Sequence, residues 1–383
     1  MIFGFLLAIT FDPNIWTAAT QPRWALLAIS LPILCAISSP NNFDLTKFIG
    51  LIFIAWASLS LFWTPNKWDG LGELIQLLII AQAFVLGSRL SSLERIFTGL
   101  ALGITISSAI ILVPALQALF VNSIVQVYPH GLWGNRNMMG EIAVLTLLGC
   151  LVYQRYWLIP GLLPAIFYYK RMVMGGTPSR GALLALVAGI CVWLWSRSKW
   201  ATGIFIGVIL VTIAATRGLD NHDGAAIERL QVWQAVYGGV DLAGRGIGSL
   251  YTLAPYLSDL WDTTERRIDH AHNEFIEILF NLGIVGATTY IAIIAIALRS
   301  SDAGTRVILV AFLVISMVAF PWHIPANAFV GALVLGHAIR GRHGLRYDYH
   351  YWRILLRHFH EACRAYYPGN NSGGKAGGEI QPV

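Results

Sequence analysis

Charged residues are scarce in this chain of 383 residues: Lys, Arg, Asp and Glu together make up 12% of it. Soluble domains carry about twice that share. Hydrophobic residues, in contrast, make up 56% of the chain. So little charge excludes an ordinary water-soluble domain and points to lipid as the main solvent of this protein.

Cysteine is also scarce, and the start of the chain has no signal-peptide pattern. Of the four Cys residues, three lie inside apolar runs and Cys363 lies in a basic segment, so no disulfide framework is predicted. The first apolar run, residues 1–11, lacks a preceding basic segment and a small-residue cleavage site. We expect it to be a retained helix.

Apolar runs recur along most of the chain, many of them near the ~20 residues that a membrane-spanning helix needs. They predict an all-α, polytopic helical membrane protein with about twelve transmembrane helices and one longer extracytoplasmic loop. The expected spans are residues 1–11, 24–38, 46–63, 71–88, 95–120, 137–153, 156–169, 181–195, 200–215, 274–298, 304–321 and 324–340. The chain shows no internal repeat.

The basic residues set the expected orientation and domain organisation. Residues 1–340 form the predicted transmembrane domain, and the loop at 217–273 is its long polar segment. Residues 341–367 mix basic and aromatic side chains, which predicts a cytoplasmic tail with both termini inside. The Gly-rich end, 368–383, is predicted to be disordered. The tail explains much of the net charge of +6, so no nucleic-acid partner is predicted.

Two short motifs on the predicted outer face open helices with an Arg. In the first, Asn135, Arg136 and Asn137 suit a turn and a helix N-cap, and Arg136 could bind an anion there. A capped helix whose Arg reaches toward water explains the pattern equally well. In the second, Ser179 is a candidate cap and Arg180 presents a planar fork that suits phosphate. Either motif alone is weak evidence.

The long outer loop holds a third motif. Arg229 and Trp233 are four residues apart and share one face of a predicted helix. They precede Gly244-x-Gly-x-Gly248, which allows tight backbone approach. The glycine run is not a dinucleotide-binding fingerprint, because no strand and helix surround it.

The fourth motif is a cluster of titratable residues at the start of the apolar run 274–298. His270 and His272 flank Ala271, with Asp269 before them and Glu274 after. Imidazole suits proton transfer near neutral pH, and a carboxylate beside it can orient it. No Cys or further His lies nearby to complete a metal site, so no metal is predicted. Interfacial histidines without catalytic function are the plainer interpretation.

Together these motifs resemble the O-antigen ligase superfamily, which includes O-antigen polymerases and pilin-type oligosaccharyltransferases. The resemblance covers about residues 45–340 and rests on four motifs in family order. They are Gly134-Asn135-Arg136-Asn137, Ser179-Arg180-Gly181-Ala182, Arg229-x-x-x-Trp233 with Gly244-x-Gly-x-Gly248, and His272-Asn273 followed after nine residues by Gly283-x-x-Gly286.

The resemblance implies a metal-independent, inverting glycosyltransferase of the GT-C type in the bacterial inner membrane, active on the periplasmic face. The donor would be a polyprenyl-diphosphate-linked glycan, and the acceptor a glycan, lipid A-core or a protein. By this resemblance His272 would activate the acceptor hydroxyl, while Arg180 and Arg229 would hold the diphosphate. No cofactor is implied. Candidate substrate contacts are Arg136, Asn137, His270, Asn273 and Glu274.

Other functions fit parts of the pattern. A polymerase of the same superfamily would use the same site with a second lipid-linked repeat as acceptor. A lipid-linked glycan transporter would suit twelve spans, but transporters usually carry repeated halves and buried charges along a path. A scaffold is a further alternative. His323, between Pro321 and Pro325, is another candidate substrate contact, although a lone loop His is more often structural.

Overall fold

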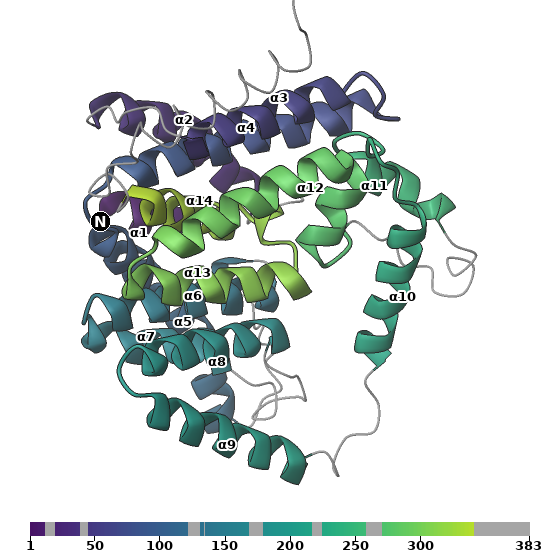
Figure 1. Cartoon of the computed structure of the whole chain (residues 1–383). Helices are drawn as coiled ribbons and strands as arrows, with labels where there is room; N and C mark the ends of the chain where they lie inside the picture. The colour runs from purple at the N-terminus through teal and green to yellow at the C-terminus, as the bar shows by residue number, and fades with distance from the viewer. Residues whose placement is uncertain are drawn as a thin grey trace, which may run out of the picture. The chain divides into compact units, whose positions relative to one another are not determined.

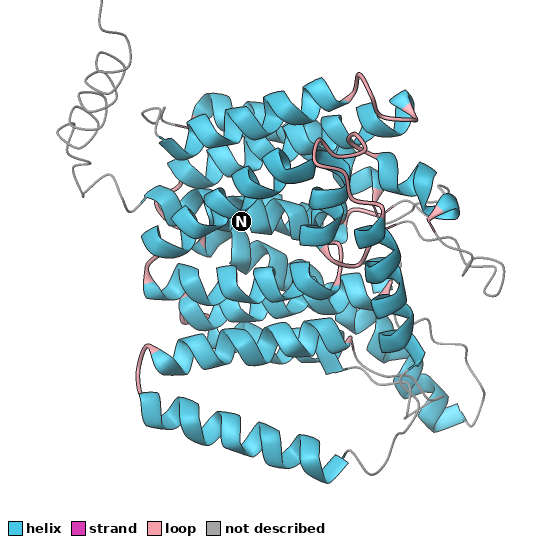
Figure 2. Cartoon of the chain, turned by 45° about the vertical axis from the view of Figure 1, so that its right-hand side comes forward, coloured by secondary structure: helices cyan, strands magenta, loops and turns pink. Residues whose placement is uncertain are grey.

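A computed structural model of the protein is helical throughout the part of the chain that it describes, with no strand in that part (Figure 1, Figure 2). The described residues are 1–11, 20–38, 45–121, 131–133, 135–167, 179–216, 224–257 and 270–340. The all-α prediction is therefore confirmed for these residues. The predicted tail at 341–367 and the predicted disordered end at 368–383 lie outside them.

The helices follow the predicted apolar runs closely. They are α1 (Ile2–Ile9), α2 (Gln21–Ile37), α3 (Leu45–Ser60), α4 (Lys67–Arg89), α5 (Glu94–Val121), η1 (Gly131–Trp133), α6 (Arg136–Val152), η2 (Tyr156–Leu158), α7 (Ile159–Phe167), α8 (Arg180–Trp195), α9 (Lys199–Thr216), α10 (Gly224–Gly238), α11 (Ser249–Leu253), η4 (Ala254–Tyr256), α12 (Glu274–Ser300), α13 (Ala303–Val318), η6 (Pro321–His323) and α14 (Pro325–Arg340). The described part of the long loop contains α10, α11 and η4, with a non-helical stretch at 239–248 between α10 and α11.

The number of membrane spans stays a prediction. By length and hydropathy, two of the described helices, α4 and α12, could each cross a bilayer. Shorter apolar helices of 10–17 residues accompany them. Such helices reach across lipid only by tilting, thinning the bilayer or adding flanking residues.

Side-chain caps begin several helices where the sequence places a short polar residue. Ser179 accepts a hydrogen bond from the backbone N–H of Ala182 at 3.3 Å, which begins α8 at Arg180. Asn135 caps α6 in the same way. Asn273 caps α12, accepting from the N–H groups of Phe275 and Ile276 at 3.0 and 3.2 Å. These caps satisfy N–H groups that would otherwise face lipid or cavity without partners.

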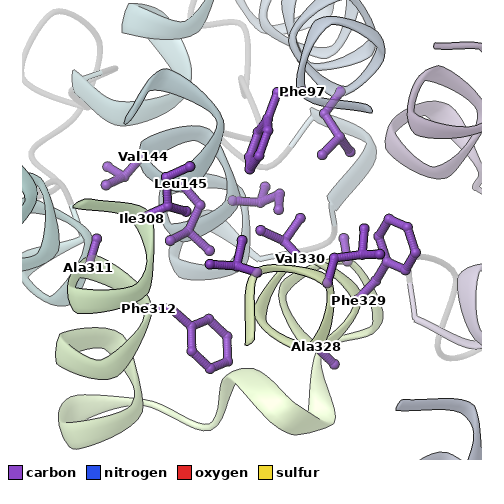
Figure 3. Close-up of a cluster of buried hydrophobic side chains, with 14 of the residues drawn as sticks. Phe97, Val144, Leu145, Ile308, Ala311, Phe312, Ala328, Phe329 and Val330 are labelled. Atoms are coloured by element: carbon purple, nitrogen blue, oxygen red, sulfur yellow. The ribbon is translucent and has the colours of Figure 1, made fainter. Parts of the chain in front are cut away.

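The apolar core lies where α6, α13 and α14 meet. Figure 3 shows Leu145 of α6, Ile308 and Phe312 of α13, and Val330 and Phe329 of α14 in one cluster, all of them buried. Helix α8 packs on α13 and α6, and α4 packs on α14 (Figure 1). This core holds α8, which carries Arg180, against the helices that lead to η6.

Helix α12 is broken at Gly283, and the glycine-rich loop fills the break. Gly283 has φ 62° and ψ −160°, which is not helical. The carbonyls of Phe280 and Asn281 accept hydrogen bonds from the N–H groups of Arg245 and Gly246, both at 2.9 Å. Gly244, with φ 79°, meets the backbone of Gly283 so closely that a side chain on either residue would clash. The predicted tight backbone approach is confirmed.

Candidate active site

The loop that carries His272 is held on both sides of the residue before it, Ala271, through the N–H and the carbonyl of that residue. The Ala271 N–H donates to Glu277 Oε2 at 2.9 Å, and the Ala271 carbonyl accepts from Trp233 Nε1 at 2.8 Å. His272 follows with φ 53°, in the left-handed region that residues other than glycine seldom adopt. The Asn273 cap then begins α12. His272 is therefore presented on a backbone conformation that its neighbours impose.

Glu277, one turn into α12, is the centre of this network. Its side chain is 2% exposed, and its Oε1 lies 3.0 Å from His270 Nδ1 and 3.2 Å from His323 Nε2. The two imidazole rings pack against each other at a tilt of 34°, with centroids 4.1 Å apart. Phe320 packs against His270 and, edge-on, against His272. The network thus joins the start of α12 to the connection between α13 and α14.

The carboxylates around His323 set its charge. Burial disfavours the charged imidazole, yet the Glu277 carboxylate, with Glu274 and Glu73 nearby, raises the pKa of His323 to about 10. His323 is therefore a cation at neutral pH and forms an ion pair with Glu277. A buried carboxylate needs such a partner to offset its loss of hydration.

The candidate phosphate-binding arginines lie on two helices near the start of α6. Arg229 is one turn before Trp233 on α10, and it lies within electrostatic range of the Glu141 carboxylate on α6. A Cβ at Gly140, the residue before Glu141, would lie 3.2 Å from the Cβ of Ser179. Ser179 in turn caps the helix that Arg180 begins. The loop of His272 is thus hydrogen-bonded to α10 through Trp233, and Arg229 on α10 lies within electrostatic range of α6. Helix α6 in turn packs against α8, which Arg180 begins.

An apolar cavity of about 430 Å³ lies between α3, α4, α12 and α14. Phe53, Ile80 and Leu335 are among its lining residues. Its polar lining includes Glu73, Glu274, Glu277 and His323, and also Lys47 and Arg89. Because a short turn joins α3 to α4, the two helices are antiparallel, and Lys47 and Arg89 lie at the end opposite Glu73. The cavity is therefore mostly apolar, with the carboxylates and His323 at one end and the two basic residues at the other.

The other predicted site residues have varied surroundings. Glu274 is buried and accepts from the Trp322 N–H at 2.8 Å, with its Oε2 3.9 Å from His323 Nε2. The Asn273 side chain is engaged as a cap, and the Asn137 N–H donates to the Asn135 cap. Arg136 begins α6, but its side chain lies outside the described structure. Several residues of the predicted motifs are also outside it: His130, Gly134, Thr177, Pro178 and Asp269.

Glu277 was not predicted from the sequence, and His323 was predicted only as a candidate substrate contact. A carboxylate inside an apolar helix is itself a signal of function in a membrane protein. Glu277 lies three residues after Glu274, on the same helix face, which would have drawn attention to both. The pairing with His323 has no local signal, because the two residues come from distant parts of the chain.

The same network offers ligands that a metal ion could use. Ligand atoms of His270, Glu277 and His323 lie within 4.8 Å of one another in the described part of the chain. However, Glu277 Oε2 already accepts from a backbone N–H and Oε1 from the imidazoles. This is the arrangement of a hydrogen-bonded ion pair, and the absence of a metal remains a prediction.

Comparison with known proteins supports the family resemblance. Residues 172–291 match the model of the O-antigen ligase family, Wzy_C. No curated protein matches the chain. The matched segment contains the motifs of Arg180, Arg229 and His272, whereas the Asn135 motif lies outside it. The match covers less than half of the chain and supports the resemblance of this segment to the O-antigen ligase family, whose members are integral membrane proteins.

Proposed function

We propose that this protein transfers a glycan from a polyprenyl-diphosphate donor to an acceptor hydroxyl on the periplasmic face of the bacterial inner membrane. The observation that carries this proposal is the hydrogen bond from Trp233 to Ala271. It ties the helix of Arg229 to the loop of His272. This tie supports the proposal, because transfer from a diphosphate requires the proposed phosphate-binding group, Arg229, and the proposed base, His272, to be held relative to one another.

The chemistry follows from these residue types. The acceptor oxygen attacks the anomeric carbon, and the bond from that carbon to the diphosphate oxygen breaks. The polyprenyl diphosphate leaves with the bonding electrons, and His272 takes the proton of the acceptor hydroxyl. Attack from the face opposite the leaving group inverts the anomeric centre. Arg180 and Arg229 stabilise the charge that grows on the leaving diphosphate, which requires no metal.

The cavity supports a lipid-linked donor. Its lining is mostly apolar and comes from four helices, which suits a polyprenyl chain. The carboxylates of Glu73, Glu274 and Glu277 would repel a diphosphate at that end of the cavity. We therefore place the diphosphate beside Arg229 and Arg180 and the chain among α3, α4, α12 and α14.

The acceptor decides between ligase and polymerase. We propose ligase as the first assignment, with lipid A-core as acceptor, and a polymerase as the alternative. The test is deletion of the gene in its host, followed by gel analysis of surface glycan. Loss of long chains from lipid A-core, with lipid-linked polymer intact, supports the ligase. Products that carry a single repeat support the polymerase.

If the protein were a transporter, the same gene deletion should give a different result. Without a transporter, lipid-linked glycan would accumulate on the cytoplasmic face rather than the periplasmic face. Treating intact spheroplasts with a glycosidase that cannot cross the membrane distinguishes the two. Donor that is digested in the deletion strain supports transfer, whereas protected donor contradicts it.

A further inference from the structure

We propose that Glu277 is the residue that positions the His272 loop for transfer, and that His323 holds Glu277 in place. This inference rests on the proposed function, because it assigns these residues a part in the same reaction. Neither residue belongs to a motif that carried the family resemblance. Both lie at the junction between the apolar cavity and the loop.

The hydrogen bonds of Glu277 support this assignment. One carboxylate oxygen accepts from the N–H of Ala271 and the other from His270, the two residues that directly precede His272. The third partner, His323, comes from η6. Two of the three bonds therefore fix the loop, and the third ties the carboxylate to a separate element of the fold. A carboxylate that only stabilised α12 would not require hydrogen bonds to this loop.

The backbone conformation of His272 explains why the loop needs a residue such as Glu277 to position it. Its φ of 53° lies in the left-handed region, which costs a residue with a side chain about 1 kcal/mol or more unless the surroundings impose it. Glu277 and Trp233 impose it by binding the N–H and the carbonyl of the preceding residue, Ala271. Loss of the Glu277 bond releases the peptide between His270 and Ala271, which lets the loop shift and moves the imidazole of His272.

The burial of the Glu277 carboxylate explains why it is held by an ion pair with His323. Glu277 is buried, and an unpaired carboxylate there would be driven to bind a proton or to turn away. The imidazolium of His323 keeps it charged and in place. Both residues line the cavity, so the network lies between the proposed polyprenyl chain and the loop of the proposed base. Besides packing on His270, His323 thus acts on the loop through Glu277.

The test is steady-state transfer by purified protein in liposomes that contain a polyprenyl-diphosphate glycan and a soluble glycan acceptor. For Glu277→Gln we expect kcat to fall about tenfold to a hundredfold, as small misplacements of a catalytic group do. The KM for the donor should stay within about twofold, because the arginines that bind it are unchanged. His323→Gln should cause a smaller fall in kcat with the same KM.

The double variant separates a shared network from two independent effects. If His323 acts through Glu277, the double variant should lose little more kcat than Glu277→Gln alone. Losses that multiply would overturn this part of the inference. Asp302→Asn, a matched carboxyl-to-amide change at the N-cap of α13, should transfer at the wild-type rate.

Failure of the inference is distinguishable from failure of the proposed function. If wild-type protein transfers glycan and Glu277→Gln matches its kcat, the positioning role is wrong and the function stands. A rise in KM with constant kcat would also overturn it, since Glu277 would then bind substrate. Activity that falls only in proportion to folded protein, measured by size-exclusion chromatography, would reduce Glu277 to a structural residue. Wild-type protein that never consumes donor would contradict the function itself.

Discussion

Two buried charged clusters in this protein differ in what surrounds them. Arg23 of α2 donates to the carbonyls of Leu7, Ala8 and Leu132 at 2.9–3.0 Å, and its guanidinium lies 3.9 Å over the Trp133 ring. Among the interactions that the described residues show, its partners are backbone carbonyls and an aromatic face. The Glu277 cluster consists of titratable side chains and borders a cavity.

The comparison distinguishes the Arg23 cluster, which stabilises the fold, from the Glu277 cluster, which belongs to the candidate active site. The carbonyls that Arg23 binds cannot change their charge, so the cluster can only hold α1, α2 and η1 together. The Glu277 cluster instead contains imidazole side chains, a group type suited to proton transfer, and it includes the loop of a third imidazole, His272. Burial of charge alone therefore says little about function; the chemistry of the partners and access to a cavity decide it.

The arginines of the proposed diphosphate site should show the largest effect among the following changes. Arg180→Lys and Arg229→Lys keep the charge but lose the planar fork that binds two phosphate oxygens. We expect each to lower kcat/KM about tenfold to a hundredfold, measured with purified protein and lipid-linked donor. The matched control is Arg155→Lys, in the exposed pair with Glu94. Equal rates for the three variants would contradict diphosphate binding.

Substitution of Arg23 tests whether its cluster contributes to stability alone. Arg23→Met leaves the three carbonyls without their donor and should lower the free energy of unfolding by about 3 kcal/mol. The midpoint of thermal unfolding in detergent reports this loss. The kcat of the protein that remains folded should equal the wild-type value. A selective fall in kcat without loss of stability would assign Arg23 to the site and remove the contrast.

The charge of His323 predicts how stability depends on pH. Its ordinary pKa is 6.5 and its pKa in the fold is about 10. Because the folded value is the higher one, the imidazolium contributes its full stability below about pH 6.5 and loses it as the pH rises through about 10. Thermal unfolding should therefore shift downward between pH 7 and pH 10 more in wild-type protein than in His323→Gln. Parallel curves would show that His323 is not held as a cation.

Chelation should have the smallest effect. If His270, Glu277 and His323 form a hydrogen-bonded network and no metal site, then dialysis against EDTA leaves the transfer rate unchanged. Inductively coupled plasma mass spectrometry of the purified protein provides the independent measurement. Activity lost to EDTA and restored by Zn²⁺ or Mn²⁺ would make these three residues ligands, and the same side chains would need another mechanism.

Local sequence signals predicted the helices and much of their boundaries. Apolar runs and the caps at Ser179 and Asn273 act over a few residues, so they can be read from the sequence. For the same reason, Gly244 could be predicted as a site of close backbone approach and Gly283 as part of a sequence motif. What the sequence could not show is that these two glycines meet, since this depends on how the long loop folds back on α12.

The candidate site was predictable only in part. His272, Arg180 and Arg229 were found because motifs of known order contain them. Glu277 and His323 were not assigned together because their pairing is a tertiary contact between α12 and η6. The Arg23 cluster was missed for the same reason: its partners come from α1 and η1, and an Arg near the start of an apolar run ordinarily indicates an interfacial residue.

The most direct test of the account is the release of polyprenyl diphosphate by purified protein and by its His272→Ala variant, in liposomes with donor and acceptor. Wild-type protein should release one polyprenyl diphosphate for each glycan joined to the acceptor. Correctly inserted His272→Ala protein should be about a hundredfold slower or more, because it lacks the base. Transfer by that variant at the wild-type rate would contradict the proposed chemistry.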